Sequence, residues 1–349
     1  MIPRAISSWA MPKPGALALQ SPMVFIAGPR QVGKTALART WSDRYFNWDT
    51  IAVRRAFSKD PQFYRTADSG WIVFDEIHKR RDWKRLLKGY FDDPDRNENF
   101  VVTGSGRFDT FQKGGDSLQG RYELFHLMPL SPDEILGETA QASAPRNFST
   151  WQPDRNIEGK DESLIRLGGF PVPFLSQSET RARRFRDLYL HRLVREDVRD
   201  FSATQRVEQL ELLARLLPER ITSPLSYQNL AGDIEASPLT IKSWLRLFET
   251  LFFGFHMKPW HRLIHRAVKR EPKWYFYDWA FAEAPGAVFE NYLAVQLKTA
   301  TLSWTEQGHG RYEVFYLRDQ DRREVDFLIA RDLKPCALIE AKVSYTEAP

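Results

Sequence analysis

One glycine-rich segment limits the possible folds of this chain more than any other part of its sequence. The segment, Gly28-Pro-Arg-Gln-Val-Gly-Lys34-Thr35, follows the short apolar run 23–27 and precedes residues 35–41, which are expected to form a helix. It has the spacing G-x-x-x-x-G-K-S/T at every fixed position, between a predicted strand and a predicted helix. Such a unit favours an α/β protein.

Each part of this segment has a predicted role at a chain of phosphates. The glycines let backbone N–H groups curl around phosphate oxygens, and the start of the following helix adds partial positive charge. Lys34 is placed for the β- and γ-phosphates and Thr35 offers a hydroxyl to Mg²⁺, so ATP with magnesium is the expected ligand. The strand–loop–helix context disfavours a chance glycine-rich turn. The predicted nucleotide-binding residues are Gly28, Pro29, Arg30, Gln31, Val32, Gly33, Lys34 and Thr35.

The segments after the glycine-rich turn alternate between apolar runs and longer stretches. The predicted strands are residues 45–48, 71–74, 99–103 and 123–127. Because the intervening segments are long enough for crossover helices, we expect a parallel sheet that is covered on both faces. The polar region 140–160, rich in proline and asparagine, is expected to be a loop or a domain junction.

Two acids, Asp75 and Glu76, end the predicted strand 71–74. Asp75 is predicted to hold magnesium, directly or through water, together with Thr35. Glu76 is predicted to polarise the attacking water as a general base. Taken alone, the pair is equally explained as a strand end that meets solvent, but the glycine-rich loop upstream favours the functional interpretation.

A hydroxyl and an arginine complete the predicted phosphate site. The next strand ends in Thr103-Gly104-Ser105, and either Thr103 or Ser105 is a candidate to hold the lytic water and to sense the γ-phosphate. Of the two arginines that follow, Arg107 and Arg121, we favour Arg121 as the guanidinium that stabilises charge on the transferring phosphoryl group. A surface salt bridge is the alternative for Arg121.

The middle of the chain is predicted to be helical. Leu210, Leu213 and Leu217 share one helix face, and Ser237-Pro238 has the pattern of an N-cap with proline at the first helical position. The helix after it is expected to bury Ile241, Trp244, Leu245, Phe248 and Leu251. With residues 225–233 it would form a helix-turn-helix, and a basic hairpin over 258–270 would be a wing that meets DNA phosphates. A packing module that relays the ATP state is the alternative.

Near the C-terminus, charged residues follow the spacing of a metal-dependent nuclease. Residues 324–330 and 337–342 are predicted strands, and Glu340 and Lys342, two apart, are expected on one face. Asp326 on the neighbouring strand and Glu290 on a helix near 287–298 would join them. Carboxylates that hold Mg²⁺ beside a lysine are used for phosphodiester cleavage, and the pattern resembles the PD-(D/E)XK nucleases. Any edge strand can carry a lone E-x-K. The chain ends shortly after Lys342, so this domain is expected to be incomplete.

Several motifs together carry a resemblance to a known family. They are Gly28 to Thr35, Asp75-Glu76-Ile-His-Lys, Thr103-Gly104-Ser105, Gly120-Arg121, Leu127-Met-Pro-Leu-Ser131, Gly168-Gly-Phe-Pro171, the helix 189–200 and Pro272-Lys-Trp-Tyr-Phe-Tyr-Asp278. They resemble AAA-superfamily ATPases of bacteria and archaea that carry a winged helix and a C-terminal nuclease-like domain of unknown function. The resemblance implies ATP hydrolysis, an AAA strand order, Ser105 as sensor and an arginine that acts within a homo-oligomer. One departure is that Asp278 precedes Trp-Ala-Phe-Ala, where members usually carry Gly-Leu.

The predicted organisation has four parts. They are an AAA ATPase core at 1–140, a loop and helical linker at 141–215, a winged-helix-like domain at 216–275 and a nuclease-like α/β domain at 276–349. The leading functional prediction is ATP hydrolysis with Mg²⁺ that drives or gates action on a nucleic acid or a protein partner. A non-catalytic, ATP-dependent regulatory module and an ATP-gated DNA nuclease remain open.

Composition narrows the environment of the chain. No apolar run approaches the ~20 residues of a membrane helix, and a single cysteine, Cys336, excludes an intramolecular disulfide framework and a cysteine zinc cluster. These features predict a cytoplasmic protein without a membrane partner. The net charge of +5 permits contact with DNA without requiring it. The partner, the oligomer size and the preferred base stay undecided by the sequence.

Overall fold

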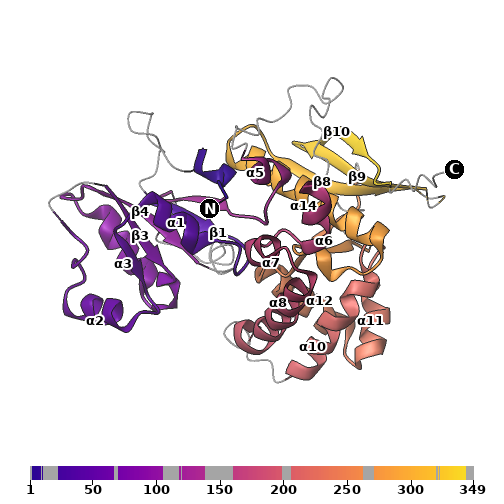
Figure 1. Ribbon diagram of the computed structural model, residues 1–349, viewed down its shortest axis with the longest axis horizontal. Helices are drawn as coiled ribbons and strands as arrows, with labels where there is room; N and C mark the ends of the chain where they lie inside the picture. The colour runs from indigo at the N-terminus through magenta and orange to yellow at the C-terminus, as the bar shows by residue number, and fades with distance from the viewer. Residues whose placement is uncertain are drawn as a thin grey trace. The chain divides into compact units, whose positions relative to one another are not determined.

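A computed structural model describes most of the chain and divides it into two units (Figure 1). Unit 1 comprises Met1–Met128 and Gly137–Gln141, and unit 2 comprises Pro129–Leu136 and Ala142–Pro349. The described residues are 2–8, 10, 23–66, 70–104, 118, 120–137, 160–198, 206–261, 271–319, 321 and 323–342. Among them, no helix is both long enough and apolar enough to cross a membrane.

Unit 1 is built on a five-stranded sheet in the order β2-β3-β4-β1-β5, and every pair of neighbours is parallel (Figure 1). The strands are β1 (Met23–Ala27), β2 (Tyr45–Asn47), β3 (Gly70–Asp75), β4 (Glu98–Thr103) and β5 (Glu123–His126). In the register, Asp75 lies opposite Thr103, and Ile26 also lies opposite Thr103. The parallel sheet predicted from the sequence is confirmed, and its carboxyl edge carries Asp75 and Thr103.

Helices and loops cover both faces of this sheet. They are η1 (Ala5–Ser8), α1 (Lys34–Trp41), α2 (Ile51–Lys59), η2 (Ile77–Lys79) and α3 (Trp83–Asp92). One face is aliphatic, with Val24, Val73 and Val101 packed against Leu37 of α1. The other face is aromatic: Phe74 and Phe100 stack at 5.8 Å between ring centroids, and Tyr64 and Tyr90 pack against both rings. The faces differ because successive strand residues point to opposite sides.

Unit 2 begins with a set of helices. They are α5 (Pro132–Leu136), α6 (Lys160–Leu167), α7 (Pro171–Ser176), α8 (Glu179–Arg192), the π-helical turn η5 (Leu193–Asp197), α10 (Val207–Leu216), η6 (Leu217–Arg220), α11 (Tyr227–Ile234) and α12 (Pro238–Thr250). Ser237 caps α12, because its hydroxyl accepts a hydrogen bond from the Thr240 N–H at 3.1 Å. Two consecutive helices, α11 and α12, lie where the helix-turn-helix pair was predicted.

Two small antiparallel sheets and a long helix complete unit 2. The elements are β6 (Gly254–Met257), β7 (Lys273–Phe276), η7 (Trp279–Phe281), α14 (Pro285–Glu306), β8 (Tyr312–Arg318), β9 (Glu324–Arg331) and β10 (Lys334–Ile339). β6 pairs with β7, and β9 lies between β8 and β10. α14 is longer than the predicted helix over 287–298, because its threonine and serine positions pack inside the unit and continue the helix. β10 ends at Ile339, so the predicted strand through Lys342 was wrong at its end.

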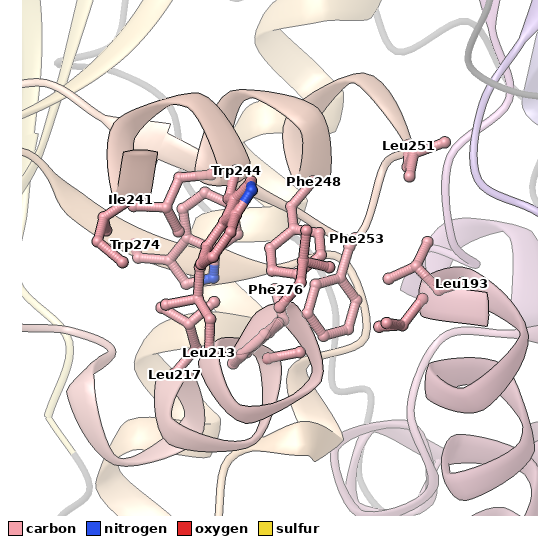
Figure 2. Packing of buried hydrophobic residues seen from close by; sticks show 14 of the residues in the cluster. Leu193, Leu213, Leu217, Ile241, Trp244, Phe248, Leu251, Phe253, Trp274 and Phe276 are labelled. Atoms are coloured by element: carbon pink, nitrogen blue, oxygen red, sulfur yellow. The ribbon is translucent and has the colours of Figure 1, made fainter. Parts of the chain in front are cut away.

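The core of unit 2 joins the helices to the small β6–β7 sheet. Figure 2 shows Trp244 and Phe248 of α12 beside Trp274 and Phe276 of β7, in one cluster with Leu213. All five residues predicted to be buried on α12 are buried, as are Leu210, Leu213 and Leu217. The helical periodicity of this region was therefore read correctly from the sequence.

A pair of glycines fits a buried turn in unit 2. A Cβ on Gly168 would lie 2.3 Å from Asp278 Oδ1, and one on Gly169 would lie 2.4 Å from the Trp279 ring. The motifs Gly168-Gly and Asp278-Trp therefore touch each other, although they are far apart in the chain. Asp278 is fully buried, and burial raises the pKa of its carboxyl to about 6.

A side-chain amide covers one edge of β7. Asn291 of α14 accepts from the Phe276 N–H at 2.9 Å and donates to the Phe276 carbonyl at 2.7 Å. Phe276 lies opposite Gly254 of β6 in the register. Asn291 is fully buried, so this double hydrogen bond fixes α14 against β7.

Candidate functional site

The predicted phosphate loop forms a tight turn between β1 and α1. Gly28 has a φ of 143°, and a Cβ on it would lie 2.2 Å from the Leu127 carbonyl oxygen. Gly33 has a φ of 105° and is the N-cap of α1, where its carbonyl accepts from the Leu37 N–H at 2.9 Å. Both fixed glycines of the motif are thus required by the backbone of this chain.

Two cationic side chains bond to the carbonyls of this loop. The Lys34 ammonium is buried and donates to the carbonyls of Gly28 at 2.9 Å and Pro29 at 2.7 Å. Arg4 donates to the Val32 carbonyl at 2.9 Å from the opposite end of the motif. The contact of Lys34 keeps its charge at the loop. The contact of Arg4 was not predicted, because no motif marks this arginine.

Asp75 is the centre of a group of hydroxyls at the carboxyl edge of the sheet. Its carboxylate accepts from the Thr35 hydroxyl at 2.8 Å and from the Thr103 hydroxyl at 2.5 Å. The Tyr45 hydroxyl, from β2, also donates to it. Asp75 is buried, yet these three donors are neutral, so none of them cancels its charge. The carboxylate therefore stays available to a cation.

Tyr45 is a site residue that the sequence analysis missed. Burial and, next, the hydrogen bond to Asp75 raise the pKa of Tyr45 to about 12, which keeps its hydroxyl protonated as a donor. Asn47, two residues later, donates to the Tyr45 oxygen at 3.3 Å. The only available signal was the predicted strand 45–48, whose neighbour in the sheet could not be assigned from the sequence.

Glu76 follows Asp75 in a left-handed conformation, with a φ of 57°. Its carboxylate lies 3.4 Å from His78 Nε2 and 3.6 Å from Lys79 Nζ. Lys79 also lies 2.5 Å from Asp49. Burial raises the pKa of Glu76 and the charge of Asp75 raises it further, whereas Lys79 and Lys34 lower it. A partly buried carboxylate with a raised pKa is a group suited to accept a proton.

The other predicted groups of unit 1 are placed only in part. Thr103 contacts Asp75, whereas Ser105 and Arg107 lie outside the described residues. Arg121 donates to Asp92 at 3.1 Å, and its guanidinium lies 5.4 Å from the Phe91 ring centroid. The structure thus gives Arg121 the surface ion pair that was the alternative for it, and its predicted role at a phosphate stays a prediction.

The four nuclease-like residues of unit 2 fall into two separate pairs of contacts. Lys342 Nζ lies 3.0 Å from Glu340 Oε1, and both side chains are largely exposed. Glu290 and Asp326 instead face a different cation, the buried ammonium of Lys273, at 3.2 and 3.9 Å. Lys273 was not predicted as a site residue, since the sequence showed it only as one of several basic residues after His256. The basic residues at 262–270 lie outside the described part of the chain.

The parallel sheet, the loop between β1 and α1 and the acid at the end of β3 define a P-loop NTPase core. Residues 20–136 match the family model of an AAA domain, which implies nucleotide binding, and residues 161–287 match a domain of unknown function (DUF8612). The order of the five strands agrees with the AAA match.

Two curated relatives and two solved structures place the chain among similar proteins. It is 24% identical over 265 residues to the uncharacterized proteins Rv2008c of Mycobacterium tuberculosis and Mb2031c of Mycobacterium bovis, a match that covers 74% of this chain and 55% of each relative. The chain therefore spans about half the length of the curated relatives it matches. A Walker-type ATPase of Pyrococcus abyssi is similar at 13% identity, with a TM-score of 0.45 over 77% of this chain and 91% of that one. The Aeropyrum pernix ORC1 protein, solved in complex with DNA, is similar at 13% identity, with a TM-score of 0.35 over 84% and 91%.

Proposed function

We propose that unit 1 binds ATP with Mg²⁺ and hydrolyses it. The observation that carries this proposal is the contact of the Thr35 hydroxyl with the Asp75 carboxylate, 2.8 Å long, directly beside the phosphate loop. A hydroxyl and a carboxylate in contact can both reach one cation, and hard oxygen ligands suit magnesium. The residues present therefore fit a nucleotide with its metal.

Lys34 has the position needed to follow a phosphate chain. Its ammonium donates to two backbone carbonyls of the loop, those of Gly28 and Pro29. Phosphate oxygens are stronger acceptors than neutral carbonyls because they carry charge, so the ammonium can exchange one set of partners for the other without leaving the loop. We therefore assign Lys34 to the β- and γ-phosphates.

Asp75 and Glu76 have different proposed roles, metal binding for Asp75 and proton acceptance for Glu76. Bound magnesium neutralises charge on the phosphates, and Thr35 and Asp75 are the residues that would hold it. Glu76 would accept a proton from the attacking water, and its raised pKa makes it a stronger base for that role. His78 and Lys79, which contact the Glu76 carboxylate, orient it. Ser105 as the sensor and Arg121 as a phosphate-facing arginine, acting within a homo-oligomer, complete the proposal.

The decisive test is phosphate release by the purified protein, compared with a Lys34→Ala variant. Wild type should release phosphate from ATP in the presence of Mg²⁺, and Lys34→Ala should lose nucleotide binding because it lacks the cation that faces the phosphates. If the variant bound labelled ATP with unchanged affinity, the assignment of Gly28 to Thr35 as the phosphate-binding loop would be wrong. Tight binding by wild type without phosphate release would instead support the non-catalytic regulatory module.

We further propose that α11, α12 and the β6–β7 hairpin form a winged-helix-like module that contacts DNA. Three neighbouring polar side chains of α12, Lys242, Ser243 and Arg246, are exposed, while the opposite side of the helix is buried in the core. Exposed cations on the second helix of such a pair suit phosphate contacts. Hydrolysis in unit 1 would then gate the action of this module on a nucleic acid, and a protein partner is the alternative.

A double variant, Lys242→Ala with Arg246→Ala, tests the DNA proposal. It should weaken binding to duplex DNA and reduce the dependence of affinity on salt, since each lost phosphate contact lowers that slope by about one. Arg183→Ala with Arg184→Ala on α8 is the matched control, because it removes the same number of positive charges from exposed positions on another helix. An equal loss in both proteins would show only a general effect of charge.

A further inference from the structure

The most unusual charged group of unit 2 is Lys273, the first residue of β7. Its side chain is 1% exposed, and its ammonium lies 2.6 Å from Glu324, 3.2 Å from Glu290 and 3.9 Å from Asp326. The Tyr316 ring completes the enclosure, with its centroid 5.5 Å from the ammonium. Three carboxylates thus converge on one buried lysine. They come from α14 and from β9, so the ammonium joins three elements of the fold.

The carboxylates around Lys273 have further hydrogen-bond and ion-pair partners. The Tyr275 hydroxyl donates to Glu290 at 2.7 Å, and the Ala341 N–H donates to Asp326 at 2.8 Å. Arg318 lies 3.7 Å from the second oxygen of Glu324. The carboxylates are therefore held in place by neutral donors and one cation outside the cluster. The Tyr275 hydroxyl and the ammonium of Lys273 share one oxygen of Glu290, Oε1.

A nuclease-like fold implies a divalent cation at such carboxylates, and the residues of this chain do not fit one. Magnesium requires several oxygen ligands at about 2.1 Å around a single point. Here the centre between Glu290, Glu324 and Asp326 holds a lysine nitrogen, which has the same sign of charge. In the part of the chain that the structure describes, no group of three or more His, Cys, Asp or Glu side chains is arranged to hold a metal ion.

We propose that Lys273 takes the place of the divalent cation in unit 2. The three carboxylates bind an internal ammonium, which ties β7, α14 and β9 together and excludes a catalytic metal. The nuclease-like part of this chain is then a scaffold that binds no metal ion for phosphodiester cleavage. This inference does not depend on ATP hydrolysis in unit 1, because every residue that carries it lies in unit 2.

The test removes the ammonium and asks whether Mn²⁺ takes its position. A Lys34→Ala background without nucleotide separates this site from the phosphate site. Mn²⁺ should leave the thermal midpoint of that background protein unchanged. Lys273→Met, which keeps the length of the side chain without its charge, should lower the midpoint. Mn²⁺ should then raise it by roughly 5 °C at about 100-fold its Kd. Adding Asp326→Asn should abolish this response.

A matched control is Lys342→Met, because Lys342 pairs with Glu340 but is 76% exposed. It should show no response to Mn²⁺. Equal Mn²⁺ shifts with and without Lys273 would overturn the proposal, since the ammonium would not exclude the metal. The absence of a shift in Lys273→Met would overturn it too, since the cluster would not be a cation site.

If Lys273→Met does not fold, binding of Mn²⁺ to the Lys34→Ala protein is measured by electron paramagnetic resonance. The proposal expects the same number of bound ions in that protein and in the same protein with Asp326→Asn. Loss of a bound Mn²⁺ on Asp326→Asn would show that the cluster holds metal beside Lys273, and the proposal would be wrong.

Discussion

Unit 1 and unit 2 each gather polar groups around carboxylates that are buried or partly buried, but the partners of those carboxylates differ. Asp75 in unit 1 accepts from three neutral hydroxyls, those of Thr35, Thr103 and Tyr45. In unit 2, Glu290, Glu324 and Asp326 face the ammonium of Lys273. Hydroxyls satisfy the hydrogen-bonding capacity of a carboxylate and leave its charge in place, whereas an ammonium opposes the charge and fills the space.

The comparison separates two requirements of a cation site, charge and room. Three carboxylates against one lysine leave the cluster of unit 2 negative, so shortage of charge does not keep a second cation out. A second cation is kept out by the lysine nitrogen, which occupies the position between the carboxylates. In unit 1 a single carboxylate provides less charge, but the Thr35 hydroxyl beside it is a second proposed ligand for magnesium. Carboxylates alone therefore do not identify a metal site, and the groups between them decide.

The largest effect is expected at Glu76, the proposed general base of unit 1. Glu76→Gln should keep ATP binding and lower turnover by about 100-fold or more, the scale of a lost general base. Phosphate release and labelled-nucleotide binding would be measured on the same preparation. Turnover at the wild-type rate would move the base to another residue.

Glu98→Gln is the matched control for this substitution. Glu98 is another glutamate of unit 1, and it is buried, but it begins β4 and so lies at the amino edge of the parallel sheet, away from the phosphate loop. Its replacement is expected to change the thermal midpoint without changing turnover per folded molecule. A comparable loss of turnover in both variants would indicate damage to the sheet and not the loss of a base.

Asp278 extends the comparison, because it is a buried carboxylate that contacts neither a group of hydroxyls nor an ammonium of the described residues. Its Oδ1 accepts from the Ala280 N–H at 3.3 Å, and its Oδ2 has no hydrogen-bond partner among the described residues. Burial raises its pKa from 3.8 to about 6, opposed by Arg186. Its contribution to stability is therefore complete below pH ~4 and is lost as the pH rises through about 6.

The expected loss is at most about 3 kcal/mol of unfolding free energy, from a shift of about two pKa units. Asp278→Asn should remove this pH dependence, so the difference in stability between wild type and variant should change between pH 4.5 and 7.5. Urea unfolding at several pH values measures it. Asp321→Asn, at an exposed position, should run parallel to wild type. If the stability of Asp278→Asn changed with pH in the same way as that of wild type, burial would not raise the pKa of Asp278.

The smallest effect concerns the hydroxyls around Asp75. Tyr45→Phe removes a donor to a charged acceptor, which should cost about 2 kcal/mol of unfolding free energy. Tyr90→Phe removes a hydroxyl that donates to a neutral acceptor, the Pro61 carbonyl, and should cost about 1 kcal/mol. Chemical denaturation of the two variants gives the difference. Equal costs would mean that the Asp75 contact strengthens the fold no more than a hydrogen bond to a backbone carbonyl.

Much of unit 1 could be predicted because its signals are local. A strand, a glycine turn and a helix follow one another within 23–41, and each predicted strand of the sheet lies within about a residue of the observed one. Tyr45 and Arg4 escaped prediction, because their contacts depend on which segments become neighbours. That information is not local, since strand order follows from the packing of the whole sheet.

In unit 2 the helical periodicity of α10 and α12 predicted the buried faces, because a 3.6-residue repeat is visible in any amphipathic helix. The acidic cluster was predicted only in half. Glu290 and Asp326 were recognised from a spacing pattern, but Lys342 was chosen as their lysine because it stands two residues after Glu340 on a predicted strand. Lys273 belongs to β7, and only the folded chain brings its nitrogen between the acids.

The double hydrogen bond of Asn291 has a consequence for the edge of β7 that does not pair with β6. A strand at the edge of a sheet offers its N–H and carbonyl groups to any other chain, and this is a route to aggregation. Asn291 satisfies both groups of Phe276 with one side chain, so β7 is blocked at that point without another strand. The same amide that fixes α14 thus occupies the backbone groups of Phe276 that an added strand would use.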